Sequence, residues 1–106
     1  MSRRVRVRWT HRSIEDLLAI GRYIAEDDPR AARQWVERLR QRATEAAATP
    51  KAGRRVPEVE RENIREVLLR SYRIVYRVLR DEIEVLTVFE GHRRLPGDAI
   101  PGDDEG

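Results

Sequence analysis

The sequence predicts an α+β fold with two layers, in which an N-terminal strand and an antiparallel helical hairpin precede a twisted antiparallel sheet, in the order β-α-α-β-β-β. Three observations lead to this prediction. Apolar residues alternate with arginines near the N-terminus, two stretches with helical periodicity follow each other closely, and three consecutive strand-like runs fill residues 64–90. We expect the hairpin to cover one face of the sheet.

The first strand and the first helix follow from the spacing of apolar residues. Val5, Val7 and Trp9 alternate with arginines, which is the period of a strand with one buried face. A helix is expected to begin at Ser13, because Asp16 lies three residues further on, as in an imperfect capping box. Its apolar stripe comprises Ile14, Leu17, Leu18, Gly21, Ile24 and Ala25.

The second helix has clear signals at both ends. Asp28 is expected to cap it and Pro29 to occupy its first position. It should end before Thr49, since the residue that precedes Pro50 avoids the helical region. Only about three residues separate the two helices, so they should form a hairpin. A polar loop is expected over residues 51–61.

The three strands are expected at residues 64–70, 72–79 and 83–90. The middle strand is partly apolar on both faces. One face carries Tyr72, Ile74, Tyr76 and Val78, and the other carries Arg73, Val75, Arg77 and Leu79. The first face can pack on the hairpin, whereas the second would expose a mixed apolar and basic surface. Such surfaces usually mark a partner site.

Composition limits the function classes. A chain of 106 residues is expected to be one domain, here residues 1–96, followed by an acidic tail at 97–106 that we expect to be disordered. The tail carries four acidic residues and no basic one, so the net charge of +3 becomes +7 for residues 1–96. Because there is no cysteine, a disulfide framework and a thiolate zinc site are excluded. The basic start has no apolar core of a signal peptide, and no apolar run is long enough to span a bilayer.

The acidic residues of the predicted loop do not suggest a metal site. Glu58, Glu60 and Glu62 lie near arginines and are interpreted as solvated loop charge, because no ligands converge at a fixed spacing. We therefore expect no metal and no cofactor. Because there is no cysteine and no signal-peptide pattern, we also expect a cytoplasmic location.

Five segments together carry a resemblance to a known family. They are Trp9 with the helix that follows, Asp28-Pro29-Arg30-Ala31-Ala32, Gly53-Arg54, Tyr72 to Val78, and the VFEGHRR run at residues 88–94. In this order and spacing, the chain resembles the RelE/ParE family of type II toxin–antitoxin toxins from about Val5 to Pro96. The resemblance implies a growth-inhibiting toxin whose antitoxin binds it through an acidic, partly apolar segment. Operator DNA would be contacted only through the antitoxin, and plasmid stabilisation is the role that such systems suggest.

The two branches of this family differ in their target. ParE-like members poison DNA gyrase without covalent chemistry, and they resemble this chain in ending on a pattern such as His92-Arg93-Arg94-Leu95-Pro96. RelE-like members cleave mRNA on the ribosome and need cations and proton-transfer groups. Here Glu66 and Leu68 stand where alternating lysines are expected, and no Tyr follows Tyr76. The resemblance is therefore closer to the ParE branch.

The resemblance and the sheet pattern together give the candidate site. The predicted target- or antitoxin-binding residues are Trp9, Tyr72, Arg73, Arg77, His92, Arg93 and Arg94. No catalytic residue is predicted for a gyrase inhibitor. If the chain is instead a metal-independent ribonuclease, Arg73, Arg93 and His92 are the candidates. Two readings stay open beside the gyrase inhibitor: a ribosome-dependent mRNA endonuclease, and a non-toxic co-repressor partner of the antitoxin.

Overall fold

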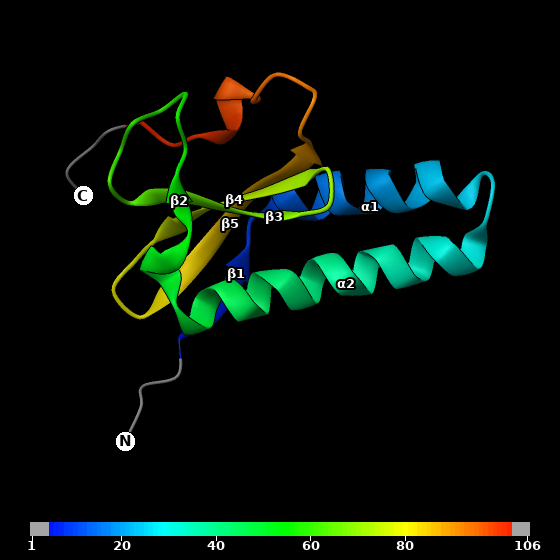
Figure 1. Ribbon diagram of the computed structural model, residues 1–106, viewed down its shortest axis with the longest axis horizontal. Coiled ribbons are helices and arrows are strands. Elements are labelled where there is room, and N and C mark those ends of the chain that lie inside the picture. The colour runs from blue at the N-terminus through cyan, green and yellow to red at the C-terminus, as the bar shows by residue number, and fades with distance from the viewer. Residues whose placement is uncertain (1–4, 103–106) are drawn as a thin grey trace.

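The computed structural model describes residues 5–102 and places a helical hairpin on one face of a five-stranded sheet (Figure 1). The sheet order is β1-β5-β4-β3-β2. The two α-helices are α1 (His11–Ala25) and α2 (Pro29–Ala48), and two short 3-10 turns are η1 (Pro50–Ala52) and η2 (Gly97–Ala99). The strands are β1 (Arg6–Trp9), β2 (Arg54–Arg55), β3 (Ile64–Leu69), β4 (Tyr72–Val78) and β5 (Glu82–Glu90). The predicted fold class is confirmed.

Helix α2 begins where the sequence predicts, whereas α1 begins two residues earlier than predicted. The Asp28 side chain accepts hydrogen bonds from the backbone N–H groups of Arg30 and Ala31, as expected of an N-cap. Helix α1, however, begins at His11 and not at Ser13. The Thr10 hydroxyl caps it by accepting from the backbone N–H of Ser13 at 3.1 Å, and the Ser13 hydroxyl donates to the carbonyl of Thr10.

The sheet is mixed. Its part over β3, β4 and β5 is the antiparallel meander that the sequence predicts, and β1 adds a parallel pair. β1 runs parallel to β5, and every other neighbouring pair is antiparallel. The parallel pair is possible because the hairpin and three further strands separate β1 from β5, which provides the long connection that parallel strands need. The two-residue strand β2 lies in the segment predicted as loop and pairs with β3. A register shift between Val75 and Tyr76 interrupts the β4–β5 ladder.

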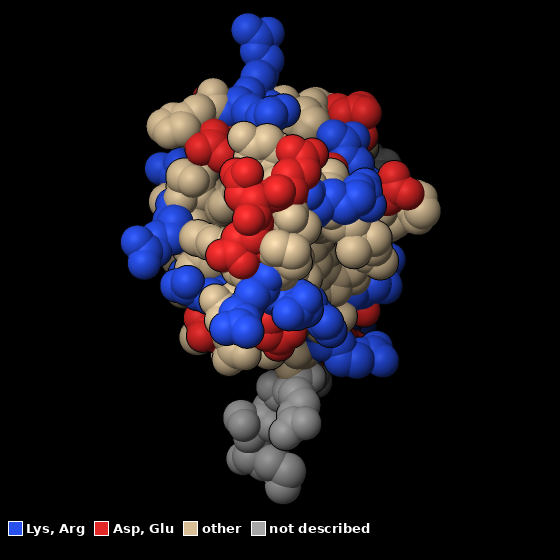
Figure 2. Space-filling model, turned by 90° about the vertical axis from the view of Figure 1, so that its right-hand side faces the viewer, with Lys and Arg blue, Asp and Glu red and all other residues tan. Residues whose placement is uncertain are grey.

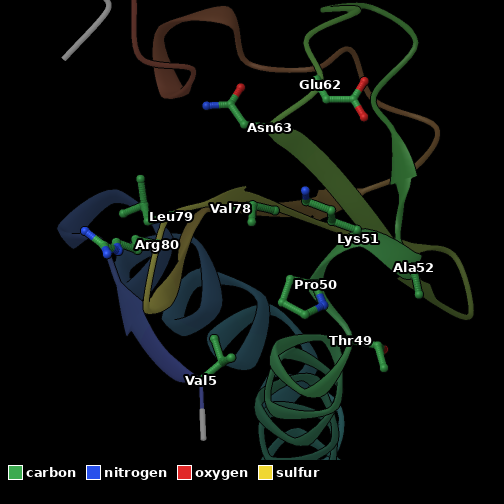
Figure 3. Close-up of a pocket in the computed structure, with 10 residues that line it drawn as sticks. All are labelled: Val5, Thr49, Pro50, Lys51, Ala52, Glu62, Asn63, Val78, Leu79 and Arg80. Atoms are coloured by element: carbon green, nitrogen blue, oxygen red, sulfur yellow. The ribbon is translucent and has the colours of Figure 1, made fainter. Parts of the chain in front are cut away.

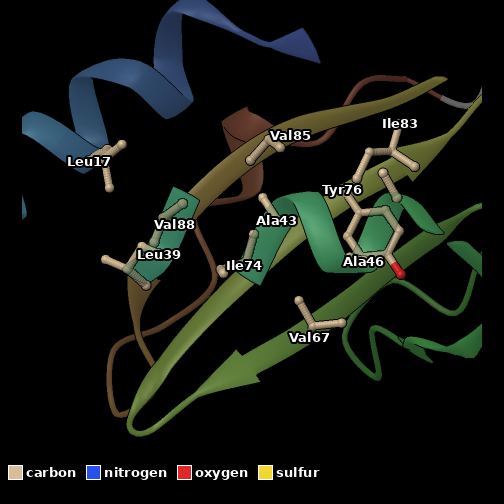
Figure 4. Packing of buried hydrophobic residues seen from close by; sticks show 11 residues of the cluster. Leu17, Leu39, Ala43, Ala46, Val67, Ile74, Tyr76, Ile83, Val85 and Val88 are labelled. Atoms are coloured by element: carbon tan, nitrogen blue, oxygen red, sulfur yellow. The ribbon is translucent and has the colours of Figure 1, made fainter. Parts of the chain in front are cut away.

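The main core lies between the hairpin and the sheet (Figure 4). Leu39 and Ala43 from α2 are fully buried there, together with Ile74 and Tyr76 from β4. The Tyr76 hydroxyl is satisfied inside this core by donating to the carbonyl of Pro50 at 2.7 Å. The hairpin therefore buries the face of β4 that the sequence assigns to it.

The opposite sheet face, which we call the loop face, is also covered by the chain itself. A second cluster buries Val56, Ile64, Val75, Leu86 and Phe89 there. Val59 packs on it from the loop after β2, and Leu95 and Ile100 pack on it from residues 95–102, which we call the strap. Figure 1 shows the loop and the strap on the side of the sheet away from α2. The expected exposed apolar and basic surface is thus largely closed by residues that the sequence analysis treats as loop and tail.

The strap differs from the disordered tail that the sequence predicts from residue 97 onward. Residues 97–99 form η2, Asp98 pairs with Arg12 at 3.1 Å, and Arg61 donates to the carbonyl of Pro101 at 2.6 Å. The prediction relied on the polar composition of the tail and missed the anchoring of Ile100 in the apolar cluster. Residues 103–106 lie outside the described part of the chain. None of the described helices is long and apolar enough to cross a membrane.

Candidate functional site

The seven predicted site residues fall into four separate places. Arg73 lies on the loop face of β4, and Arg77 lies nearer the other end of this strand. Trp9 is partly buried and packs against the core between hairpin and sheet. The remaining four, Tyr72, His92, Arg93 and Arg94, lie at the beginning of β4 and just after β5.

Arg73 is engaged within the chain on all three guanidinium nitrogens. Its Nε donates to Glu66 Oε1 at 2.7 Å, while Nη1 and Nη2 each donate to a carboxylate oxygen of Glu58 at 2.9 Å. The guanidinium carbon also lies 4.9 Å from the centre of the Phe89 ring. Glu66 is fully buried, and its second oxygen accepts from Arg54 Nε. Arg73 is therefore the centre of an internal charge network in the loop face.

This network shifts the titration of its members. The hydrogen bond from Arg73 lowers the pKa of the Glu58 carboxyl from 4.5 to about 2, although partial burial opposes the shift. The pKa of the Arg73 guanidinium is raised, chiefly by the hydrogen bond to Glu58. Both groups are consequently charged across the neutral range, and each neutralises the other.

Arg77 belongs to a second internal network at the other end of the sheet. Its Nη2 and Nε donate to Glu84 Oε1 at 2.7 and 3.0 Å. The other oxygen of Glu84 pairs with Arg8 at 3.0 Å, and Arg8 also reaches Glu82. This network ties together β4, β5 and β1, and Glu84 is largely buried in it.

His92, Arg93 and Arg94 differ from these two arginines because they are exposed. The backbone N–H of His92 donates to the Glu90 carboxylate at 2.9 Å, and the imidazole, which is 87% exposed, lies 3.7 Å from the other Glu90 oxygen. The side chains of Arg93 and Arg94 have no hydrogen bond or ion pair with any other described residue. They are thus cations available to an external anion.

A cleft of about 690 Å³ lies next to these arginines, between α1 and the end of β5. We call it the α1–β5 cleft. Tyr72, Arg93 and Arg94 line it, together with residues that the sequence analysis did not select, among them Arg12, Tyr23 and Phe89. Arg12 is committed to Asp16 and Asp98. Tyr23 is 74% exposed, and its place outside the apolar stripe of α1 is the sequence signal that would have pointed to it.

A second hollow, of about 710 Å³, lies where α2 ends near the turn between β4 and β5 (Figure 3). Its lining is mainly apolar and includes Val5, Pro50, Val78 and Leu79, with Lys51 and Arg80 beside them. None of the predicted site residues lines it. In the described part of the chain, no group of three His, Cys, Asp or Glu residues is placed to hold a metal ion.

Charge on the surface is a mosaic and does not form one basic face. Figure 2 looks onto the end of the molecule where α1 and α2 are joined, and it shows acidic side chains in the middle with Lys and Arg around them. The connection between the helices supplies the exposed acids Glu26, Asp27 and Asp28. Position, more than net charge, therefore distinguishes the available arginines from the neutralised ones.

Comparison with known proteins assigns the chain to a family. The family model described as "ParE toxin of type II toxin-antitoxin system, parDE" matches residues 7–95. The chain belongs to the ParE toxin family. It is the toxin of a ParDE-type toxin–antitoxin system, and such a system implies an antitoxin as its partner. This confirms the resemblance found in the sequence.

One relative supports the assignment of this ParE toxin, and a solved structure shares its fold. A protein of Sinorhizobium fredii (strain NBRC 101917 / NGR234) named "Putative toxin Y4kP" is 40% identical over 100 residues, which cover 91% of this chain and 97% of that protein. A solved structure described as "Chromosomal ParDE TA system from P. aeruginosa" matches with a TM-score of 0.69 at 23% identity. The match covers 84% of this chain and 98% of the other, so the two chains share their fold over almost the whole length of the solved structure.

Proposed function

We propose that this ParE toxin inhibits DNA gyrase by binding to it, without covalent chemistry of its own, and that its antitoxin neutralises it. The observation that carries the proposal is the contrast between two kinds of arginine. Arg73 is neutralised by Glu58 and Glu66 inside the loop face, whereas Arg93 and Arg94 have no partner among the described residues. Free cations at a cleft favour binding to an anionic or acidic surface.

The same contrast argues against a ribonuclease. Metal-independent cleavage of RNA needs several uncompensated cations around the reacting phosphate, and of the two arginines predicted for this chemistry Arg73 is neutralised, which leaves Arg93. Of the two positions where lysines are expected, Glu66 is buried against Arg73 and Leu68 is an exposed apolar residue. Among the described residues, Glu90 is the one carboxylate near the His92 imidazole, and at 3.7 Å it is too far away to orient the ring by a hydrogen bond.

A supercoiling assay tests the proposal. Toxin separated from its antitoxin should inhibit gyrase or stabilise cleaved DNA, and the Arg93→Ala/Arg94→Ala variant should require about tenfold more protein for the same effect. Arg30→Ala/Arg33→Ala is the matched control, because it removes two exposed arginines of α2 and should leave inhibition unchanged.

Two outcomes would contradict the proposal. One is the absence of any effect of excess wild-type toxin on gyrase that is demonstrably active. The other is new A-site breaks that the wild-type toxin produces in a toeprinting assay on translating ribosomes and that are lost in the exposed-site variant Arg93→Ala, which would favour the endonuclease. Expression that leaves growth unaffected would favour the co-repressor over both.

A further inference from the structure

The α1–β5 cleft combines aromatic, basic and acidic side chains. Tyr23 and Tyr72 provide aromatic surface, and Glu90 provides a carboxylate. Arg93 and Arg94 provide guanidinium groups that have no partner among residues 5–102. Helix α1 contributes the first tyrosine, the start of β4 the second, and the end of β5 with the segment after it the charged groups.

Tyr72, one of the two tyrosines of the cleft, packs against Trp35 of α2. The Tyr72 ring lies 5.6 Å from that of Trp35 at an interplanar angle of 60°, and the Arg38 guanidinium lies 5.1 Å from the Trp35 ring centre. Tyr72 is thus held in place, whereas Tyr23 presents most of its ring to solvent. An exposed aromatic ring beside a fixed one is a surface on which a planar ligand can stack.

The charges of the cleft are suited to a ligand with both anionic and donor groups. Asp16 is neutralised by Arg12, so the net attraction for an anion comes from Arg93 and Arg94. Glu90 accepts from the backbone N–H of His92 and is partly exposed. A carboxylate accepts hydrogen bonds from the exocyclic amino groups of bases, while arginines bind phosphate.

We propose that the α1–β5 cleft binds an unpaired nucleotide of a nucleic-acid strand. Its base stacks on Tyr23, and the phosphates on either side of it contact Arg93 and Arg94. Its three parts, an aromatic plane, an anionic phosphate and amino donors, match the three kinds of side chain in the cleft. A peptide made only of acidic residues would use the arginines but would leave the tyrosines without a matching group. This site goes beyond the proposed function, because nucleotide binding does not require gyrase. It can therefore be measured with the toxin alone.

Fluorescence anisotropy with a short, labelled, mixed-sequence single strand of DNA tests the proposal. Tyr23→Ala should weaken binding about tenfold, whereas Tyr23→Phe keeps the ring and should bind like wild type. Arg93→Ala/Arg94→Ala should reduce the slope of log affinity against log salt by about 1.4, the value for two phosphate contacts on a single strand. Arg30→Ala/Arg33→Ala should leave this slope unchanged. Tyr23 is exposed, and circular dichroism of each variant verifies its fold.

Competitors decide the nature of the ligand. Weaker binding of the matching duplex supports the proposal, because a paired base is not available to Tyr23, whereas equal or tighter duplex binding overturns it. A single strand of RNA with the same sequence that binds more tightly supports the site and identifies RNA as its source. Polyglutamate that displaces the DNA as well as unlabelled DNA does would overturn the proposal and make the cleft an acidic-peptide site. Unchanged affinity in Tyr23→Ala would overturn it as well.

Discussion

At the scale of single residues, the state of each arginine depends on what folds against it. Arg73 and Arg93 are the same residue type and lie near the ends of neighbouring strands. Arg73 is bound by two carboxylates, whereas Arg93 is bound by none in the part of the chain that the structure describes. A buried ion pair adds little net stability, but removing one partner leaves an uncompensated charge, which costs several kcal/mol. Glu66 is fully buried, so its role is to hold Arg73 inside the fold and not to contact a partner.

The Glu58–Arg73 pair makes stability depend on pH. The folded pKa of Glu58 is about 2, below its value of 4.5 without the fold, so the unfolded chain binds more protons between these limits. The contribution of the pair is therefore complete above pH 4.5 and is lost as the pH falls toward 2. In urea denaturation at a series of pH values, Glu58→Gln should flatten the fall in unfolding free energy over this window.

The control for this titration is Glu37→Gln, which removes an exposed carboxylate from the outer face of α2. It should leave the pH dependence as in wild type. If Glu58→Gln and the wild type lose stability in parallel from pH 4.5 to pH 2, the pair does not contribute as described.

The arginine pattern shows how far a sequence can locate a site. The exposure of Arg93 and Arg94 follows from their position after the last strand, which the sequence places correctly. The engagement of Arg73 could not be foreseen, because it needs the β3–β4 register that brings Glu66 near it and a loop that folds Glu58 over the sheet. An arginine in a strand has the same local sequence pattern whether its guanidinium is paired inside the fold or free at the surface. Only long-range contacts decide between these two states.

At the scale of elements, the sequence predicts a helix or strand boundary correctly where the local signal is strong, and misses it where tertiary contacts decide. Asp28 and Pro29 define the start of α2 because each satisfies a need of the first helical turn. At α1, Thr10 and Ser13 can both cap a helix, and the choice of Thr10 is favoured by its hydroxyl also donating to the Val85 carbonyl of β5. This tertiary hydrogen bond is invisible in a local pattern. The short strand β2 was missed for the same reason, since it exists only through its pairing with β3.

Gly53 immediately precedes β2 and allows the chain to approach the core closely. A Cβ at this position would meet the Tyr76 hydroxyl and lie 2.9 Å from the Glu66 carbonyl oxygen. Gly53→Ala should therefore displace the hydroxyl from its hydrogen bond with Pro50 and lower the unfolding free energy by about 1–3 kcal/mol. Gly97→Ala is the control, because nothing lies within 4 Å of the added carbon. Equal stability of the two variants in urea denaturation would contradict this role of Gly53.

At the scale of the whole molecule, the sheet has a core on each face, although the sequence assigns only one of them. The helices cover one face, and the loop after β2 and the strap cover the other (Figure 1). Composition alone suggested a tail, because residues 97–106 contain four acidic residues and few apolar ones, among them Ile100. Leu95 and Ile100 pack against the apolar cluster of the loop face, and polar contacts of Asp98 and Pro101 add to this anchoring.

The strap should therefore stabilise the fold, and Ile100 tests this. Ile100→Ser removes a partly buried apolar contact from the loop face and should lower the unfolding free energy by about 1–2 kcal/mol, with increased binding of an apolar dye such as ANS. Ile14→Ser makes the same chemical change at a side chain of α1 that is 43% exposed, and its cost should stay below about 0.5 kcal/mol. A chain ending at Arg94 should lose more stability than Ile100→Ser, because Leu95 and the Asp98–Arg12 pair are lost too. If this shortened chain unfolds at the same urea concentration as the full chain, the strap covers the loop face without stabilising it.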